Sequence, residues 1–466
     1  MVNNYLKNQK ILYAAALAAS ILFCIAMTSM GITKYYSVLQ GGDNYNDFPT
    51  SGFSLIRLLI NGSYLIATVT YIIWLIQKKQ TSSSFLDICK YAIPFLALAL
   101  IAYPQSSDIY MYLHYGAMSL QNINPYLNNA HTLISNVSPF LHWGQTSTYG
   151  PVSLFFFALS ALAVPISPLL AVYIFKIICV LVHALNAYLI WRLLTNAEYR
   201  NLITLAYLVN PMLLNEQIAN AHLDVLLANT LIVLIGCIYY QRYVFAILAI
   251  WVGFLVKTLP IIWLPLVVAF LCKQRRWRDL AASVLLSLLI IAVLTYTFMP
   301  TVSAWRSLLN PGTAGATARS FHHAINLFLI FSPNVSVEIR ESILSFLKYF
   351  AYLSWIVYYA GTLIKSFFRK KDSEINLVSD IGWTTLTLFL FATPWLMPWY
   401  PSILLPIAAL SINSPHFVLT SLTFSLSPSL ILGAGSGTTV ISLVTSFVSV
   451  VPPTAWLIFG RKKALF

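Results

Sequence analysis

Charge is scarce in this sequence. Asp, Glu, Lys and Arg make up 9% of the 466 residues, whereas 59% are hydrophobic and the mean hydropathy is +0.77. Because soluble domains contain about 25% charged residues, this composition excludes a water-soluble globule. Apolar stretches near the ~20 residues that cross a bilayer recur from Ile11 to the C-terminus. Lipid offers the backbone no hydrogen-bond partners, so these stretches predict an all-α, polytopic membrane protein.

Cysteine is also scarce, and phosphate-binding motifs are missing. The five cysteines are an odd number, and all lie within or at the ends of apolar segments, which argues against a disulfide framework or a zinc site. No G-x-x-x-x-G-K-[ST] loop is present, so no soluble nucleotide site is expected. The sequence also shows no internal repeat and no heptad pattern.

Basic residues are grouped along the chain. They give a net charge of +14, and 18 of the 27 occur at seven places: Lys7 and Lys10, Lys78 and Lys79, Arg192 and Arg200, Arg242, Lys273 to Arg278, Lys365 to Lys371, and Arg461 to Lys463. The stretches 91–175 and 201–241 contain polar loops but no Lys or Arg. The positive-inside rule therefore predicts that these loops are external and that both termini are cytoplasmic, and it explains the charge without nucleic acid.

About 13 to 14 transmembrane helices are expected. They run approximately over 11–29, 53–76, 85–103, 168–191, 201–215, 225–240, 243–258, 260–272, 280–299, 342–364, 380–396, 401–412, 416–432 and 438–459. A further crossing at 150–166 would place Arg192 and Arg200 outside, so we interpret that segment as a re-entrant or membrane-parallel helix. We expect one domain over 1–466, with an external loop at 104–149 that begins as an amphipathic helix capped by Ser106 and Ser107.

Three of the 13 acidic residues lie in polar motifs at predicted outer boundaries: Asp108, Glu216 and Asp224. A carboxylate near an apolar boundary has a raised pKa, which suits a general base. Asp108 is the candidate base, and the alternative is a solvated helix-start carboxylate. His222 and Asp224 similarly belong either to a site or to a polar helix cap.

Other polar residues carry two interpretations each. Lys257 stands between apolar runs, so it either has an anionic partner or extends to the interface. Arg319 either binds phosphate or is an ordinary residue of an external loop. Trp399 and Tyr400 form an aromatic belt or stack on a sugar.

These motifs together resemble the GT-C class of membrane glycosyltransferases, and most closely the polyprenol-phosphate-mannose-dependent α-mannosyltransferases of bacterial lipoglycan synthesis. The resemblance covers roughly residues 80–410. It rests on Asp108 and Tyr112, Asn124 to Tyr126, Tyr149 to Pro151, Asn210-Pro211 with Glu216, Asn220, His222 and Asp224, and Pro398 to Tyr400. The sequence has Ser106-Ser107-Asp108 where relatives carry D-x-D, and Ala221 and Leu223 where they carry Gly and Asn.

The resemblance implies an inverting hexosyltransferase in the plasma (inner) membrane. It would move a sugar, mannose first, from a polyprenyl-phosphate carrier to a glycan or glycolipid acceptor at the non-cytoplasmic face. Asp108 would be the base. Substrate-binding residues would be Tyr112, Asn124, Tyr126, Tyr149, Glu216, Asn220, His222, Asp224, Lys257, Arg319, Trp399 and Tyr400. No cofactor is expected, and a divalent metal is left open.

Two rival classes remain at this point. A transporter or flippase of lipid-linked sugars would show internal repeats and ionisable residues near mid-membrane. A membrane scaffold would not explain polar motifs confined to one face.

Accessibility from outside tests the topology. Cysteines placed near Asn128 and near Glu216 should react in intact cells with a membrane-impermeant thiol reagent, because both positions are predicted to be external. A cysteine near Arg276 should react only after the membrane is opened. Protection of both outer positions would contradict the topology.

Overall fold

The computed structural model describes residues 2–42, 45, 54–77, 84–141, 143–194, 199–309, 316–370, 373–411, 414–430 and 439–460. In these ranges every named element is helical, and extended pairing is limited to one isolated bridge between Ala318 and Trp395. The predicted all-α class is therefore confirmed. The basic groups at Lys78-Lys79 and Arg461 to Lys463 lie outside the described residues.

The described chain divides into two compact units. The first consists of 1–229, 254–258 and 292–312, and the second of 230–253, 259–291 and 313–466. Helices α9 (Asp224–Tyr239) and α12 (Trp277–Thr297) contribute to both. The expectation of a single domain stays a prediction.

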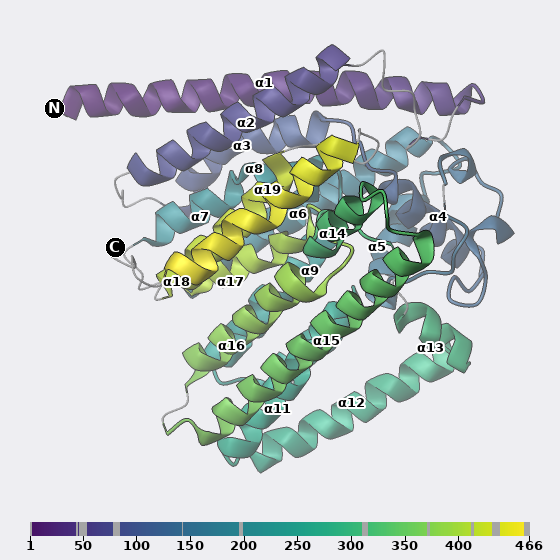
Figure 1. The fold of residues 1–466 in the computed structure, drawn as a ribbon, viewed down its shortest axis with the longest axis vertical. Helices are drawn as coiled ribbons and strands as arrows, with labels where there is room; N and C mark the ends of the chain where they lie inside the picture. The colour runs from purple at the N-terminus through teal and green to yellow at the C-terminus, as the bar shows by residue number, and fades with distance from the viewer. Residues whose placement is uncertain are drawn as a thin grey trace. The chain divides into compact units, whose positions relative to one another are not determined.

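The first unit combines long helices with short ones. Helix α1 (Val2–Leu39) packs along α2 (Ser54–Gln77) (Figure 1). The other elements are α3 (Phe85–Ile101), α4 (Asp108–Leu120), α5 (Pro151–Ala161), α6 (Pro168–Leu193), α7 (Arg200–Leu208), α8 (Pro211–Leu213), η4 (Leu214–Ala219) and α13 (Val302–Leu309). Serine side chains start two of these helices, since Ser84 and Ser167 accept from the backbone N–H of Asp87 and Leu170.

The second unit is also built from helices joined by short turns. Its elements are α10 (Tyr243–Phe254), η5 (Leu259–Trp263), α11 (Leu264–Lys273), α14 (Phe321–Ile330), α15 (Val337–Phe368), α16 (Glu374–Thr387), η6 (Leu388–Ala392), η7 (Tyr400–Ile403), α17 (Leu404–Leu410), α18 (Pro415–Leu426), η8 (Ser427–Leu430) and α19 (Thr439–Phe459). Helix α15 packs on α11 and α14.

Seven helices in the described part of the chain are long and apolar enough to cross a membrane. They cover Gln9–Leu39, Leu55–Gln77, Pro168–Leu193, Trp277–Thr297, Val337–Phe368, Glu374–Ala392 and Val440–Phe459. The other predicted spans are shorter helices. Segment 201–215 is interrupted after Leu208 because Pro211 has no N–H and Asn210 caps a new helix there.

Helix α5 has the length expected for the predicted re-entrant or membrane-parallel segment. Its 11 residues extend for roughly 17 Å, which is too short for a hydrocarbon core about 30 Å thick.

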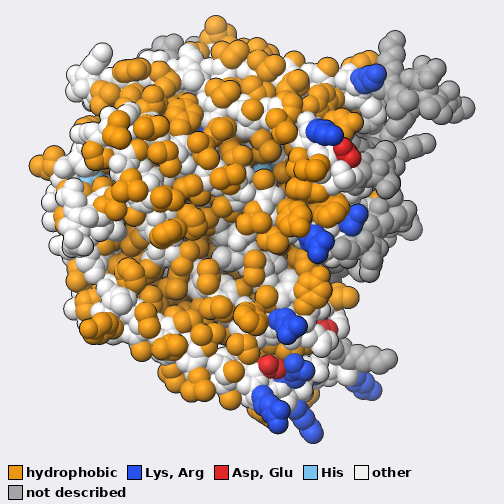
Figure 2. Space-filling view, turned by 180° about the vertical axis from the view of Figure 1, so that it is seen from behind, with side chains coloured by type: hydrophobic (Ala, Val, Ile, Leu, Met, Phe, Trp, Pro, Cys, Tyr) orange, Lys and Arg blue, Asp and Glu red, His pale blue; other side chains and the backbone are white. Residues whose placement is uncertain are grey.

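Hydrophobic side chains cover most of the surface shown in Figure 2. Leu58, Leu288 and Phe346, on three different candidate spans, each expose more than half of their area. Because such apolar exposure suits lipid and not water, it supports an integral membrane protein.

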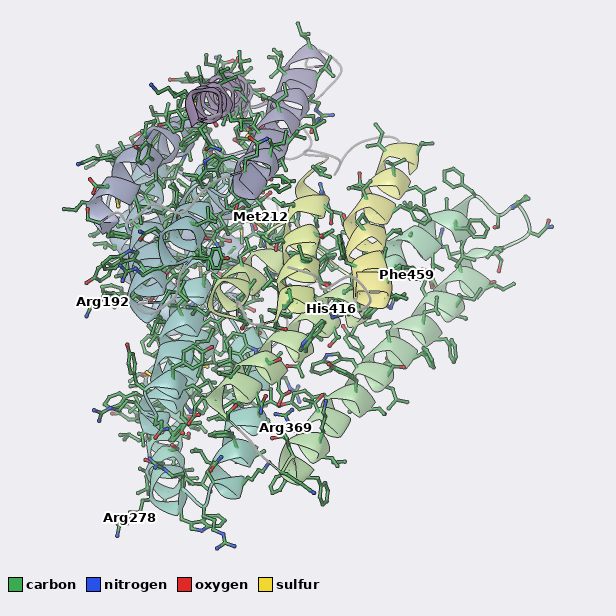
Figure 3. The ribbon with its side chains drawn as sticks, turned by 90° about the vertical axis from the view of Figure 1, so that its left-hand side faces the viewer. Arg192, Met212, Arg278, Arg369, His416 and Phe459 are labelled. Carbon is green, nitrogen blue, oxygen red and sulfur yellow. The ribbon has the colours of Figure 1, made fainter. Side chains whose placement is uncertain are left out.

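Basic side chains mark helix ends. Arg192 near the end of α6 points away from the first unit (Figure 3). In the second unit, Nζ of Lys273 donates to the carbonyl of Arg369 at 2.6 Å, so α11 and α15 end side by side. Both positions lie near helix ends, where the positive-inside rule counts basic residues.

Candidate functional site

The Asp108 carboxylate lies at the start of α4. Ser106 Oγ accepts from the Asp108 N–H at 3.3 Å, whereas the Ser107 side chain makes no cap bond. Of the two predicted caps, Ser107 occupies the N-cap position without a side-chain cap bond, and Ser106 supplies the hydroxyl that accepts from the helix start. The Asp108 side chain keeps 17% of its area exposed.

Helix α4 is buried on every side from Ile109 to Met118, so its predicted amphipathic character is wrong. The polar side chains of α4 form hydrogen bonds within the protein. The Tyr110 hydroxyl lies 2.8 Å from that of Tyr103, and His114 Nε2 lies 2.6 Å from the Ala130 carbonyl oxygen. A helix can be buried all round when its polar side chains are satisfied in this way.

His222 lies between two carboxylates. Its Nδ1 is 3.6 Å from Oδ2 of Asp108, and its Nε2 is 3.5 Å from Oε2 of Glu216. The imidazole is fully buried and the Glu216 side chain is 3% exposed. Segments more than 100 residues apart in sequence thus form one acidic cluster, which we define as Asp108, Glu216, His222 and Asp224.

Lys257 pairs with Asp224 beside this cluster. Its Nζ lies 3.1 Å from Oδ1 and 3.4 Å from Oδ2 of Asp224, the first residue of α9. The anionic partner expected for an apolar lysine is therefore Asp224. The lysine side chain is 24% exposed, and that of Asp224 4%.

Burial and these charges set the proton affinities of the cluster. Burial raises the pKa of Asp108 to about 6. Lys257 opposes that rise, Asp224 adds to it, and the Ser106 hydrogen bond lowers it. Burial, and then Lys257, hold the pKa of His222 well below its ordinary value. Asp108 is consequently a carboxylate with the proton affinity of a general base.

Gly150 and Ser153 hold the segment that carries Lys257. The N–H of Val152 and the hydroxyl of Ser153 donate to the carbonyls of Leu255 and Val256 at 3.0 and 2.9 Å. A Cβ at Gly150 would lie 2.2 Å from the Leu255 carbonyl oxygen, so only glycine permits this approach. The start of α5 therefore positions Lys257.

The predicted aromatic residues of the external loop mainly contact the protein. Tyr112 stacks on Phe157 with ring centroids 4.7 Å apart. Tyr126 donates through its hydroxyl to the Tyr149 carbonyl at 2.7 Å. Asn124 accepts from the Tyr126 N–H at 2.9 Å, which forms the predicted turn. We expect these residues to shape the site.

The remaining predicted residues belong to the second unit. Arg319 has φ of 49° and donates to the Pro428 carbonyl. The Trp399 and Tyr400 rings lie edge to face, with centroids 6.0 Å apart. Their roles in substrate binding stay predictions.

Three positions of the site were absent from the sequence prediction. The Gln105 N–H donates to Asn220 Oδ1 at 2.9 Å, Asn215 Nδ2 donates to Glu216 Oε1 at 2.9 Å, and Ser153 supports Val256 as described. Asn215 adjoins Glu216 in an amide-rich motif and so carried a sequence signal. Gln105 and Ser153 carried none, because their roles come from contacts distant in sequence.

The described residues contain no preformed set of metal ligands. Among the described residues, no group of three or more His, Cys, Asp or Glu side chains is arranged to hold a metal ion.

A family model described as "Alpha-(1->6)-mannopyranosyltransferase, N-terminal domain" matches residues 14–273. This match covers more than half of the chain and contains the acidic cluster, Lys257 and the Gly150 contact. No curated protein matches the chain.

Gly150→Ala should destabilise the protein by about 1–3 kcal/mol, because the new methyl group overpacks the Leu255 backbone. The measurement is thermal unfolding of purified protein in detergent. Gly62→Ala in α2 is the matched control, since its Cβ meets nothing within 4 Å. Equal unfolding temperatures for the two variants would contradict the assigned role of Gly150.

Proposed function

The chain belongs to the alpha-(1->6)-mannopyranosyltransferase family, and we propose that it transfers mannose from a polyprenyl-phosphate carrier to a glycan or glycolipid acceptor. The observation that carries this proposal is Asp108, a carboxylate that is partly exposed at the edge of a buried acidic cluster. A base must reach its substrate, and Asp108 is more exposed than Glu216 or Asp224.

The proposed reaction is a single inverting displacement. The acceptor hydroxyl loses its proton to Asp108 while its oxygen bonds to the anomeric carbon of mannose. The bond from that carbon to the phosphate oxygen breaks, and polyprenyl phosphate leaves. Inversion that yields an α-linked product requires a β-linked donor. General-base help of this kind contributes about 10²- to 10⁴-fold.

Cations would stabilise the leaving phosphate. Lys257 is the first candidate, because Asp224 and the Gly150 contact hold it beside Asp108. Arg319 of the second unit is the other candidate carried over from the sequence.

We place the site at the non-cytoplasmic face of the plasma (inner) membrane, with both termini cytoplasmic. The 26 residues of α6 extend for roughly 39 Å, which exceeds the hydrocarbon thickness. Basic Arg192 is at one end of this helix. In the other half of the helix, Lys176 donates to the Ala102 carbonyl a few residues before Asp108. The positive-inside rule then makes the Asp108 end external.

A transporter or flippase of lipid-linked sugars is the alternative function from the sequence. Membership of a transferase family favours catalysis. Membranes containing the protein, supplied with polyprenyl phosphate carrying labelled mannose, glucose or arabinose, test both. Transfer from the mannose donor alone is expected, whereas movement of the donor across the membrane without transfer would overturn the proposal.

Asp108→Asn should lower turnover by at least ~10²-fold, a barrier increase of about 2.7 kcal/mol, while the protein still folds. The amide keeps the size of the side chain but removes the basic oxygen. Turnover is measured with labelled donor and folding by thermal unfolding.

Asp87→Asn is the matched control for a helix-start carboxylate, since Asp87 completes the Ser84 capping box. It should lower the unfolding temperature slightly, because it weakens the capping box, and leave turnover intact. A folded Asp108→Asn enzyme with near-normal turnover, beside an inactive Asp224→Asn enzyme, would move the base to Asp224.

Activity should fall as pH decreases through about 6, because Asp108 must be ionised to accept a proton. Lys257→Met removes a positive charge that lowers the pKa of Asp108. In this variant the acid limb of the profile, the pH range in which activity falls on acidification, should therefore move to higher pH. Asp224→Asn removes a charge that raises this pKa, so its limb should move to lower pH.

Profiles of kcat/KM against pH for both variants measure these shifts. Each variant breaks the same ion pair, so structural damage alone would change both profiles in the same direction. If the acid limbs of both variants moved in the same direction, the assigned effects of Lys257 and Asp224 on the pKa of Asp108 would be refuted.

A further inference from the structure

The side-chain amides next to the acidic cluster have a fixed direction. The backbone N–H of Gln105 can only donate, and it faces Asn220 Oδ1 at 2.9 Å. The other end of that amide, Nδ2, therefore donates to Asn215 Oδ1 at 3.4 Å. Asn215 Nδ2 in turn donates to Glu216 Oε1 at 2.9 Å. A backbone group thus orients both amides and makes Oε1 the accepting oxygen of Glu216.

The other oxygen of Glu216 faces His222. Oε2 lies 3.5 Å from Nε2, while Nδ1 on the opposite side of the ring lies 3.6 Å from Asp108 Oδ2. A neutral imidazole has one N–H, so its second nitrogen presents a lone pair. Two ionised carboxylates would leave that lone pair against a negative oxygen, which is repulsive. At these distances neither contact of a ring nitrogen with a carboxylate is a hydrogen bond in the structure. A proton on one of the two carboxyl groups would let both contacts become hydrogen bonds.

A doubly protonated His222 is the other arrangement that would satisfy both carboxylates. Charged groups near this ring include Asp108 from α4, Glu216 from η4, and Lys257, which is paired with Asp224. The ring is fully buried and feels the positive charge of Lys257, so its pKa lies well below the ordinary value. His222 is therefore neutral at physiological pH.

Exposure decides which carboxyl group holds the proton. Water reaches the Asp108 side chain, which is 17% exposed, far more than that of Glu216, which is 3% exposed. Lys257 favours the ionised form of Asp108. A buried carboxyl group avoids the desolvation cost of a charge by staying neutral.

We propose that Glu216 is a neutral carboxylic acid whose Oε2 hydroxyl fixes His222 as the Nδ1–H tautomer, and that His222 orients the ionised Asp108 as a positioning residue. Donors and acceptors then follow one direction from the Gln105 backbone through Asn220, Asn215, Glu216 and His222 to Asp108. Hydrogen bonds aligned in this way polarise one another. The contacts to His222 are long, as is common before substrate binds, and are expected to tighten on binding.

The proton balance agrees with the displacement proposed above, on which the role of His222 rests. The acceptor O–H bond breaks and an O–H bond forms on Asp108, whereas the protons of Glu216 and His222 stay in place. Asp108 then returns its proton to water through its exposed edge.

Infrared difference spectroscopy tests the protonation of Glu216 without using turnover. Wild-type protein minus Glu216→Gln, at pH 7 in detergent, should show the carbonyl band of a protonated carboxylic acid. The same difference spectrum recorded with Asp108→Asn should show carboxylate bands instead. So should the one recorded with Glu338→Gln, which serves as an exposed control. A carboxylate difference for Glu216→Gln would overturn the proposal. If that variant does not fold, wild-type protein labelled with ¹³C at the glutamate carboxyl must still show a shifted acid band at pH 7, and its absence would overturn the proposal equally.

The pH profile tests the positioning role. His222→Leu removes the donor to Asp108, so the acid limb of kcat/KM should move to higher pH. Glu216→Leu should move it in the same direction, and Glu216→Gln, whose amide can still donate to Nε2, should restore it toward the wild-type position. Unshifted limbs in both leucine variants would overturn the positioning role. An acid band from Glu216 together with an active Asp108→Asn enzyme would refute the proposed base and leave the proton assignment standing.

Discussion

The ion pair between Lys257 and Asp224 is the interaction on which the candidate site depends. It joins the start of α9 to a segment 33 residues later and places one positive charge beside the acidic cluster. A buried pair that loses one partner typically costs about 3–5 kcal/mol, because the other charge stays buried without compensation. The pair therefore ties the local electrostatics of the site to its folding.

The single positive charge of Lys257 cannot neutralise three carboxylates. The three acidic side chains therefore differ in their surroundings. Asp224 takes the direct contact, and Asp108 keeps access to water. Glu216 is 3% exposed, receives an amide donor on one oxygen and faces an imidazole with the other. Different surroundings of this kind move the pKa values of carboxyl groups apart, and the proposed pairing of a base, Asp108, with a neutral acid, Glu216, uses that effect.

The membrane environment explains the short helices around the site. Non-helical backbone at membrane depth is tolerated only where protein satisfies its polar groups. Here α5 ends far short of a crossing, and its first turn donates to the carbonyls before Lys257. Likewise Asn210 caps α8, where Pro211 interrupts the preceding helix. Both interruptions bring polar backbone and side chains to the site without exposing them to lipid.

The sequence by itself determined the all-α membrane class, most helix positions and the three acidic positions, since hydropathy and scarce charge are properties of local composition. Asp108, Glu216, His222 and Asp224 could be selected because carboxylates are rare in an apolar chain. Only the tertiary structure decided that His222 stands between two carboxylates, that Asp224 holds Lys257, and that Gly150 and Ser153 support the lysine segment. It also showed that α4, predicted to be amphipathic, is buried on every side. These features depend on contacts between residues distant in sequence, where direction and burial of a side chain follow from packing and leave no periodic signal.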